Sequence, residues 1–435
     1  MTSCDSMGTL VPASESPLLG GQMTSALVRP VGAAVTLDIP YADRLEALQS
    51  VRDLLVEEPG PVHRLLCEIS THRAARYEIE AAVDTLEGAA EEVRTYRPGK
   101  VPSVAVFMPS NVILYSYVLY LLVPSLYAER IVFRPSSQVR DQTARLHDLL
   151  ARRHRLPVRL AAASQRGFVA EHAGPAAVVV FTGSYHNAER IRAQLSPGQL
   201  FLHLGAGVNP FVVAPGADLA AAVDDAVEVR MLNAGQDCLG PDLFCVHRSL
   251  LPAFLDALVA RLEQLRYGPY DDPGADYGPL FYESTLEETA VFLARNRASI
   301  VHGGAVDFRS SRLDPVVVVA DGVTPRTHVP EFFAPVFNVV GYDDTGSLAA
   351  TLTTGPFTER ALGASVYGDA PALTEALRRR TTVTVDATLL TVDDGNAPFG
   401  GYGRQANYIT DGERLWAEPV LISKAVADHL PEAAR

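Results

Sequence analysis

The chain has 435 residues, of which 48% are hydrophobic and 20% charged, and this length suits two or three domains rather than one core. Its formal net charge of −14 argues against binding to nucleic acid, which requires a clustered basic surface. Four cysteines (Cys4, Cys67, Cys238 and Cys245) show neither disulfide-framework nor zinc-site spacing, so we expect a reducing, cytoplasmic setting and no metal.

The N-terminal region, residues 1–30, predicts a flexible polar arm. It lacks a basic start followed by an apolar run, so no secretory signal is expected. The most apolar stretch, residues 112–127, is too short to span a membrane and carries Pro124 near its end. This stretch therefore predicts a buried helix, and nothing in the sequence indicates a membrane.

The first periodic region, residues 44–94, repeats its apolar residues at helical spacing and predicts two or three amphipathic helices. A β-rich run at 103–108 follows, then an apolar helix, then a second β-rich run at 130–133. A strand, a crossover helix and a strand form the unit of a parallel sheet.

The alternation of strands and helices continues along the chain. Strands are predicted at 158–161, 176–181, 211–214 and 243–246, and helices from about 188, at 218–233 and at 251–265. Valine runs without polar alternation indicate strands that are covered on both faces. The pattern, which extends to about residue 393, predicts two α/β domains in series.

Two glycine-containing segments follow predicted strands. Phe181-Thr182-Gly183-Ser184 lies between a strand and a helix, where small residues let backbone N–H groups approach a pyrophosphate. The alternative is an ordinary strand-to-helix turn. The second segment, residues 202–207, is equally compatible with any tight turn.

A third segment, Asn233-Ala234-Gly235-Gln236-Asp237-Cys238, places a cysteine in a polar loop after a helix. A nucleophilic thiol must be reachable and partly ionised, and a loop beside backbone donors favours the thiolate. The alternative is that Cys238 is an inert small hydrophobic residue.

Together these segments resemble the aldehyde dehydrogenase superfamily, in the family's order, over residues 101–424. The family's markers, in order, are Pro-x-Asn, Lys-Pro-Ser, Phe-Thr-Gly-Ser, Glu-Leu-Gly-Gly, Asn-x-Gly-Gln-x-Cys, Glu-x-Phe-Gly-Pro-Val and Pro-Phe-Gly-Gly. At the matching places, and in the same order, this chain has Pro109-Ser110-Asn111, Arg134-Pro135-Ser136, Phe181 to Ser184, His203-Leu204-Gly205-Ala206, Asn233 to Cys238, Glu331-Phe332-Phe333-Ala334-Pro335-Val336, and Pro398-Phe399-Gly400-Gly401.

The resemblance implies an α/β fold with two doubly wound Rossmann-like domains plus a small β oligomerisation element. Residues 31–94 and 106–204 would form the dinucleotide-binding domain, and 205–410 the catalytic domain. Residues 95–105 and 411–425 would supply oligomerisation strands, as in a homodimer or homotetramer, because an exposed strand edge usually needs a partner. The alternative is that the last strand only closes this chain's own sheet.

The resemblance also implies residue roles. Cys238 would attack the carbonyl carbon, and Asn111 with the Cys238 backbone N–H would hold the oxyanion; the alternative for Asn111 is a helix cap. Glu331 would bind the nicotinamide-side ribose, with a solvated surface acid as the alternative. The expected cofactor-binding residues are Pro109, Ser110, Arg134, Ser137, Gly183, Ser184, Glu331 and Phe333.

The chain departs from the family at its usual base, a glutamate, where this sequence has His203. The spacing to the nucleophile (238 − 203 = 35 residues) is close to the family's. Histidine has a pKa near 6.5 and could serve as the base, and a structural or thiol-binding role is the alternative. Acylating members often lack that glutamate and pass the acyl group to coenzyme A, which makes coenzyme A a possible co-substrate.

Two further departures concern the cofactor and the glycines. Arg134 replaces the usual lysine and Ser137 the acidic residue that repels a 2′-phosphate, so with Arg140 nearby we expect NADP(H) to be tolerated or preferred over NAD(H). The alternative is that both arginines face solvent. The glycines after His203 are shifted, which favours a specialised role over ordinary detoxification.

The expected function is therefore NAD(P)-dependent oxidation of a small-molecule aldehyde to an acyl thioester or acid, or the reverse, through a covalent bond to Cys238. The alternative from another class is a scaffold or binding subunit that kept the fold and lost turnover. The candidates for the lining of the substrate tunnel are Tyr115, Tyr117 and the loop 393–396. Their residue types do not identify the substrate.

Overall fold

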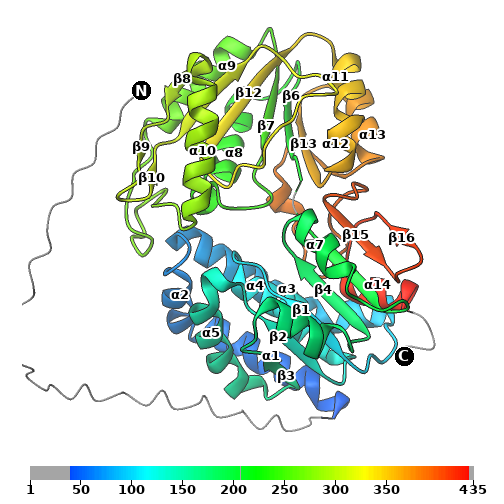
Figure 1. Cartoon of the computed structure of the whole chain (residues 1–435). Coiled ribbons are helices and arrows are strands. Elements are labelled where there is room, and N and C mark those ends of the chain that lie inside the picture. The colour runs from blue at the N-terminus through cyan, green and yellow to red at the C-terminus, as the bar shows by residue number, and fades with distance from the viewer. Residues whose placement is uncertain (1–39, 206, 431–435) are drawn as a thin grey trace, which may run out of the picture. The chain divides into compact units, whose positions relative to one another are not determined.

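Two seven-stranded sheets and a small two-stranded ribbon carry the fold in the computed structural model, which describes residues 40–205 and 207–430 (Figure 1). The predicted arm at 1–30 and Cys4 lie outside the described residues. The described residues belong to one compact unit. The expected α/β fold with two doubly wound sheets is confirmed.

The first sheet reverses its strand order at β1, which lies between β4 and β2 in a parallel arrangement. Such a switch point opens a crevice at the carboxyl ends of the strands, where ligands of open α/β sheets bind. Across the sheet the strands are β16 (Leu415–Trp416), β15 (Asn407–Thr410), β5 (Leu200–Leu204), β4 (Val178–Thr182), β1 (Val104–Phe107), β2 (Ile131–Arg134) and β3 (Val158–Leu160).

Both faces of this sheet are buried, as its valine-rich strands predict. One face packs against α1 (Tyr41–Glu57), α2 (Gly60–Leu66), α3 (His72–Tyr96), α4 (Ile113–Tyr117), α5 (Arg140–His154) and α14 (Ile422–His429). The other face packs against α6 (Gln165–Phe168) and α7 (Tyr185–Arg192). No helix in the described ranges is long and apolar enough to cross a membrane, and the stretch 112–127 forms short buried helices.

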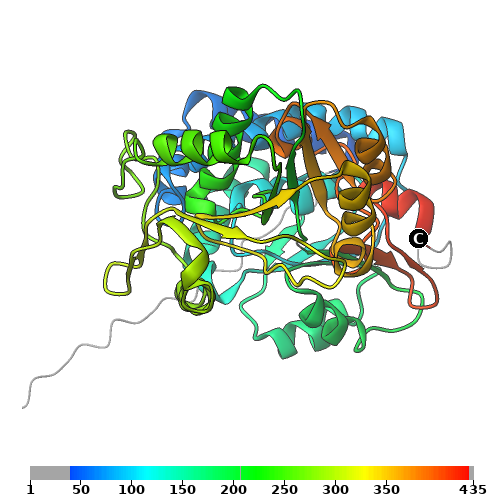
Figure 2. The same ribbon diagram turned by 90° about the horizontal axis from the view of Figure 1, so that it is seen from above.

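The second sheet is built in the same way, with helices on both of its sides (Figure 2). Its strands are β14 (Thr382–Val385), β13 (Gly363–Tyr367), β6 (Pro210–Val213), β7 (Leu243–His247), β12 (Val336–Tyr342), β11 (Val316–Ala320) and β8 (Ile300–Gly303), and β9 (Val306–Asp307) pairs with β10 (Arg312–Leu313). The helices are α8 (Leu219–Met231), α9 (Leu251–Leu262) and α10 (Glu283–Arg295) on one face, and α11 (Thr345–Leu352), α12 (Gly355–Glu359) and α13 (Pro371–Arg378) on the other.

The C-terminal strands return to the first sheet. β15 pairs antiparallel with β5 and β16 pairs with β15, so both cover the edge of the chain's own sheet (Figure 1). Residues 411–425 hold β16 and the start of α14, and their expected use as an oligomerisation strand stays a prediction beside its alternative. Residues 95–105 hold the end of α3, a bridge from Val101 to Ala128 and the start of β1, and their oligomerisation role stays a prediction too.

A buried ion pair holds the loops between the sheets in place. Arg230 of α8 has no exposed surface and lies 3.7 Å from Asp242, which is 2% exposed. The Arg230 guanidinium donates to the carbonyls of Pro241 (3.0 Å), Gly235 and Phe332. Asp242 in turn accepts from the Phe332 backbone N–H at 2.7 Å. One pair of charges therefore ties the loop after α8 to the loop before β12.

Removing one member of this pair leaves the other charge buried without a partner. We expect Arg230→Met to lower the free energy of unfolding by about 3–5 kcal/mol, measured by urea titration. The double variant Arg230→Met/Asp242→Leu removes both charges and should recover part of that loss. A single variant as stable as the parent protein would contradict this role for Arg230.

Candidate functional site

A pocket of about 780 Å³ lies at the carboxyl ends of β1, β2 and β4, where the first sheet reverses its order. It brings together five of the predicted cofactor-binding residues: Pro109, Ser110, Arg134, Ser137 and Gly183. The rest of its lining is Phe107, Met108, Ser136, Gln165, Phe181, Thr182 and Asn187. No carboxylate belongs to this lining, so Arg134 is its one charged side chain within the described ranges.

The turn from β4 to α7 has the geometry that a close-approaching phosphate needs. Gly183 has a φ of +148°, and a Cβ there would lie 3.1 Å from the Phe181 ring. Ser184 caps α7, because its hydroxyl accepts the backbone N–H of Asn187 at 3.4 Å. A bare backbone beside a helix N-terminus and an arginine fits the pyrophosphate and ribose of a dinucleotide.

Arg134 is fixed within this pocket. Its Nε donates to the Ala163 carbonyl at 3.1 Å and its Nη1 to the Pro135 carbonyl at 3.2 Å. Partial burial, with the charge of Arg140 as a second cause, lowers the pKa of its guanidinium. Arg140 itself is exposed, so the alternative that the arginines face solvent holds for Arg140 and not for Arg134.

The loop that carries Cys238 is held in an unusual backbone conformation. Asn233 and Ala234 have φ values of 49° and 55°, and at Gly235 (φ +82°) a Cβ would lie 2.4 Å from Ala334. Gln236 accepts from the Phe281 N–H at 2.8 Å and donates to the Asn233 carbonyl at 3.0 Å. The motif residues before Cys238 thus act by shaping the loop.

Asn209, which the sequence reasoning did not single out, fixes the other side of this loop. Its Nδ2 donates to the Cys238 carbonyl at 2.7 Å, and its Oδ1 accepts from the Gly363 N–H at 3.1 Å. The sequence did offer a sign of this role, the Asn209-Pro210 pair after a glycine-rich turn. An asparagine side chain just before a strand often forms hydrogen bonds with neighbouring backbone groups.

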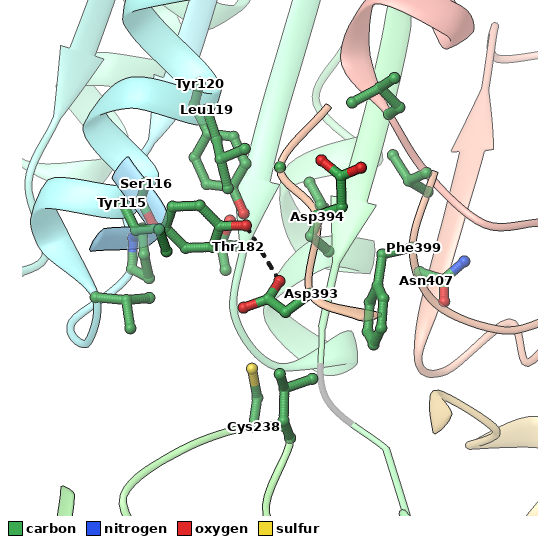
Figure 3. Close-up of a pocket in the computed structure, with 18 of the residues that line it drawn as sticks. Tyr115, Ser116, Leu119, Tyr120, Thr182, Cys238, Asp393, Asp394, Phe399 and Asn407 are labelled. Atoms are coloured by element: carbon green, nitrogen blue, oxygen red, sulfur yellow. Dashed lines mark hydrogen bonds between the residues drawn. The ribbon is translucent and has the colours of Figure 1, made fainter. Parts of the chain in front are cut away.

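Cys238 is half-buried and opens into a cavity between the two sheets (Figure 3). The lining comes from α3, α4, β4, the Cys238 loop and the C-terminal segment. It consists of Tyr77, Glu78, Ala81, Pro109, Val112, Tyr115, Ser116, Leu119, Tyr120, Thr182, Leu204, Gly205, Asp237, Cys238, Leu239, Leu362, Asp393, Asp394, Gly395, Ala397, Phe399, Asn407, Val420, Leu421 and Ile422. Cys67 and Cys245 are buried in the cores.

The surroundings of Cys238 hold its thiol in the neutral form. Burial raises its pKa well above the usual value of 9.0, and the carboxylates of Asp237, Asp393 and Glu331 raise it further. The sequence-based expectation that the loop favours the thiolate is therefore wrong for the protein without cofactor. Desolvation and three negative charges outweigh the nearby backbone donors.

Two of the carboxyl groups that line this cavity come from elements far apart in the sequence. Asp393 accepts from the Tyr115 hydroxyl at 3.1 Å and the Tyr77 hydroxyl at 3.4 Å, and burial raises the pKa of its carboxyl to about 6. Glu78 of α3 is 4% exposed and accepts the backbone N–H groups of Leu114 (2.6 Å) and Tyr115 (3.2 Å). Burial raises the pKa of Glu78 to about 7.

Glu78 explains how α4 begins. The first N–H groups of a helix need acceptors, and here a carboxylate from another helix supplies them. Helix α4 starts at Ile113 after Val112, without a side-chain cap, so the alternative that Asn111 caps this helix is wrong. Asn111 is half-exposed and lies outside the linings of both the pocket and the cavity, so its oxyanion role stays a prediction.

His203 is not brought to the cavity, which corrects its expected place beside Cys238. Its ring is fully buried on the α6–α7 side of the first sheet, 5.2 Å from the Tyr408 ring and 6.1 Å from the Phe181 ring. Burial lowers the pKa of its imidazole to about 4, so the ring is neutral near pH 7. Among the described residues neither ring nitrogen has a geometrically sound hydrogen-bond partner.

The remaining predicted residues fall outside both linings. The Glu331 residue is exposed at the surface, but the pKa of its carboxyl is raised to about 8. The main cause is desolvation by the surrounding protein, and the second is the negative charge of Asp242. Phe333 is half-buried two residues later. Of the tunnel candidates, Tyr115 and the loop at 393–395 line the cavity, whereas Tyr117 is buried and bonds His147 at 2.7 Å instead.

The raised pKa of Cys238 has a measurable consequence. In the absence of cofactor, iodoacetamide should alkylate Cys238 slowly at about pH 7, and the rate should still be rising at about pH 9, because only the thiolate reacts. Asp237→Asn removes one of the charges that raise this pKa and should therefore speed alkylation at a fixed pH.

Peptide mass spectrometry resolves Cys238 from Cys67 and Cys245. The exposed Asp321, outside the cavity, gives the matched control Asp321→Asn, which should leave the rate unchanged. A rate that levels off below about pH 8 in the parent protein would contradict a raised pKa.

Comparison with known proteins agrees with this geometry. The sequence model of the family described as "Aldehyde dehydrogenase family" matches residues 161–417. A succinate-semialdehyde dehydrogenase [NADP(+)] of Mycobacterium tuberculosis is 32% identical over 224 residues, which cover 47% of this chain and 46% of that protein. The chain thus matches about half the length of the curated relatives.

Solved structures share the fold. A glyceraldehyde-3-phosphate dehydrogenase of Methanocaldococcus jannaschii complexed with NADP superposes with a TM-score of 0.74, at 19% identity over 91% of this chain and 89% of that one. An aldehyde dehydrogenase of Brucella melitensis biovar abortus gives 0.76, at 22% identity over 89% and 84%. Because the family model spans more than half of the sequence, this chain belongs to the aldehyde dehydrogenase family.

Proposed function

We propose that the protein is an NAD(P)-dependent oxidoreductase of aldehydes, in which Cys238 bonds covalently to the carbonyl carbon. One observation carries this proposal: Pro109 and Thr182 line both the dinucleotide-type pocket and the Cys238 cavity, so the two spaces adjoin. A nicotinamide cofactor bound in the pocket would supply the hydride acceptor. Family membership and the match to NADP-named relatives support the same assignment.

The covalent step begins with a neutral thiol. The Cys238 proton would pass, directly or through water, to a carboxylate in the cavity, for which Asp393 with a pKa of about 6 is ionised near pH 7. A carbon–sulfur bond then forms while the carbonyl electrons move to oxygen. The Asn111 amide and the Cys238 backbone N–H are the proposed donors to that oxyanion.

Release of the acyl group is proposed to use water. His203 is buried on the far face of its sheet, whereas the carboxyl groups of Glu78 and Asp393 line the cavity and can accept a proton from water. Coenzyme A carries several phosphates, and a cavity lined by carboxyl groups would repel them. The coenzyme A route that the missing glutamate suggested therefore becomes the second choice.

The decisive experiment is NAD(P)H formation with a series of aldehydes, with and without coenzyme A. We expect turnover with water alone, no stimulation by coenzyme A, and complete loss of turnover in Cys238→Ala, because the sulfur carries the covalent bond. Reverse assays with acyl thioesters and NADPH test the other direction. Turnover that appears only with coenzyme A would reject the hydrolytic route.

A binding subunit without turnover is the second candidate function. The neutral Cys238 thiol and the buried His203 are the observations that favour it. In that case Cys238 should stay unreactive toward iodoacetamide even with NAD(P) bound, and no aldehyde should reduce the cofactor. Alkylation that becomes faster when cofactor is added would instead support the enzyme.

The pocket supports use of NADP(H). Among the described residues that line it, Arg134 is the one charged side chain, and there is no carboxylate that would repel a 2′-phosphate. We expect Arg134→Ala to raise the KM for NADP⁺ about tenfold and that for NAD⁺ much less, because the arginine pairs only with the extra phosphate. The exposed Arg166, outside the lining, gives the control Arg166→Ala. An equal effect on both cofactors would contradict the proposal.

Oligomeric state and location in the cell stay predictions. The homodimer or homotetramer is proposed on the family resemblance; within the chain, β15 pairs with β5 and β16 pairs with β15. The described residues include no cluster of His, Cys, Asp or Glu that could hold a metal ion.

A further inference from the structure

The charged side chains that line the cavity at Cys238 are all acidic. Four of its lining residues carry carboxyl groups, Glu78, Asp237, Asp393 and Asp394, and none of the lining residues is a lysine, arginine or histidine. Apart from these acids the wall is mainly aromatic and aliphatic. A substrate that enters this space therefore meets negative charge and apolar surface together.

Asp393 is the carboxylate best placed to meet a ligand. The hydroxyls of Tyr115 and Tyr77 each donate to one of its oxygens, at 3.1 and 3.4 Å, which orients the group and leaves lone pairs on both. Figure 3 shows the Cys238 sulfur pointing toward Asp393 from the facing loop. The reacting atom and the oriented carboxylate thus share one space.

The charge of an aldehyde's tail decides how well it fits such a cavity. An anionic tail would lose its hydration, find no cationic partner among the lining residues and be repelled by the acids. A cationic tail would be attracted by the carboxylates and would also contact aromatic faces such as those of Tyr115 and Phe399. A neutral tail would gain only apolar contact.

We propose that the substrate of this site is an aldehyde with a positively charged tail, an alkylated or protonated amine, and that Asp393 is the residue that binds the charge. This inference rests on the proposed aldehyde oxidation at Cys238. In the charge of its substrate, the chain would therefore differ from enzymes that oxidise a carboxylate-bearing aldehyde. The M. tuberculosis relative, a succinate-semialdehyde dehydrogenase, is named as an enzyme of that kind.

A matched pair of substrates tests the proposal. One is 4-(trimethylammonio)butanal, and the other is 5,5-dimethylhexanal, which has the same shape with carbon in place of the charged nitrogen. We expect kcat/KM for the cation to exceed that for the neutral aldehyde by about tenfold or more, and succinate semialdehyde to be the poorest of the three. A neutral or anionic aldehyde that is preferred would overturn the proposal.

Substitution of Asp393 separates charge binding from general-base catalysis. Asp393→Asn should lower kcat/KM for the cationic aldehyde about tenfold more than for its neutral counterpart, because only the cation loses a partner. The control Asp321→Asn removes an exposed charge outside the cavity and should change neither. An equal loss for both substrates would mean that Asp393 acts as a base or in positioning, and would overturn its assigned role.

A test that needs no turnover keeps this inference distinct from the proposed function. Methanethiosulfonates with a trimethylammonioethyl or a sulfonatoethyl group form a mixed disulfide with Cys238, releasing methanesulfinate, with the thiol proton going to solvent. Peptide mass spectrometry follows the rate at which each reagent modifies Cys238. The rate with the cationic reagent, divided by the rate with the anionic one, should be about ten times the same quotient for free cysteine. This quotient should be smaller in Asp393→Asn.

The two results can be read separately. If no aldehyde is oxidised but the cationic reagent is favoured, the proposed oxidation fails and the charge preference of the cavity stands. If aldehydes are oxidised but the reagents react in the same ratio as with free cysteine, the oxidation stands and the inferred substrate class is wrong.

Discussion

The arrangement of the site depends on the buried pair of Arg230 and Asp242. A guanidinium without exposed surface must satisfy its donors inside the protein, and Arg230 does so on the carbonyls of Gly235, Pro241 and Phe332. Those carbonyls belong to the Cys238 loop and to the loop between β11 and β12, which also carries Glu331. The strained backbone at Asn233 and Ala234 is held because the charge pair fixes the chain on either side of it.

The return of the C-terminal segment completes the cavity. After β14 of the second sheet, the chain crosses to the first sheet, where β15 pairs with β5. The crossing segment brings Asp393 and Phe399 opposite α3 and α4. A strand that covers a sheet edge therefore also closes the cavity, and the site exists only when both sheets and this crossing are in place.

Local sequence predicted those parts of the structure that depend on local pattern. Runs of apolar, β-favouring residues predicted β1, β4 and β7, and the Gly183 turn and Cys238 loop were found where the motifs indicated. His203 was misplaced because its strand is apolar on both faces, so alternation does not reveal its side. In β5, Phe201 and His203 face α6 and α7, and Leu204 faces the cavity. Glu78 could not be found, because its partners are the N–H groups of another helix.

The electrostatics of the cavity link the neutral thiol to the choice of substrate. Asp237 and Asp393 both raise the pKa of Cys238 and line the cavity, so they also favour a positive charge brought near them, because both effects come from the same negative field. A cation that binds beside Asp393 would offset that field and so lower the pKa of the Cys238 thiol. If the substrate is the proposed cation, it would promote ionisation of the thiol that attacks it, whereas without a bound cation the raised pKa keeps the sulfur protonated and less open to oxidation.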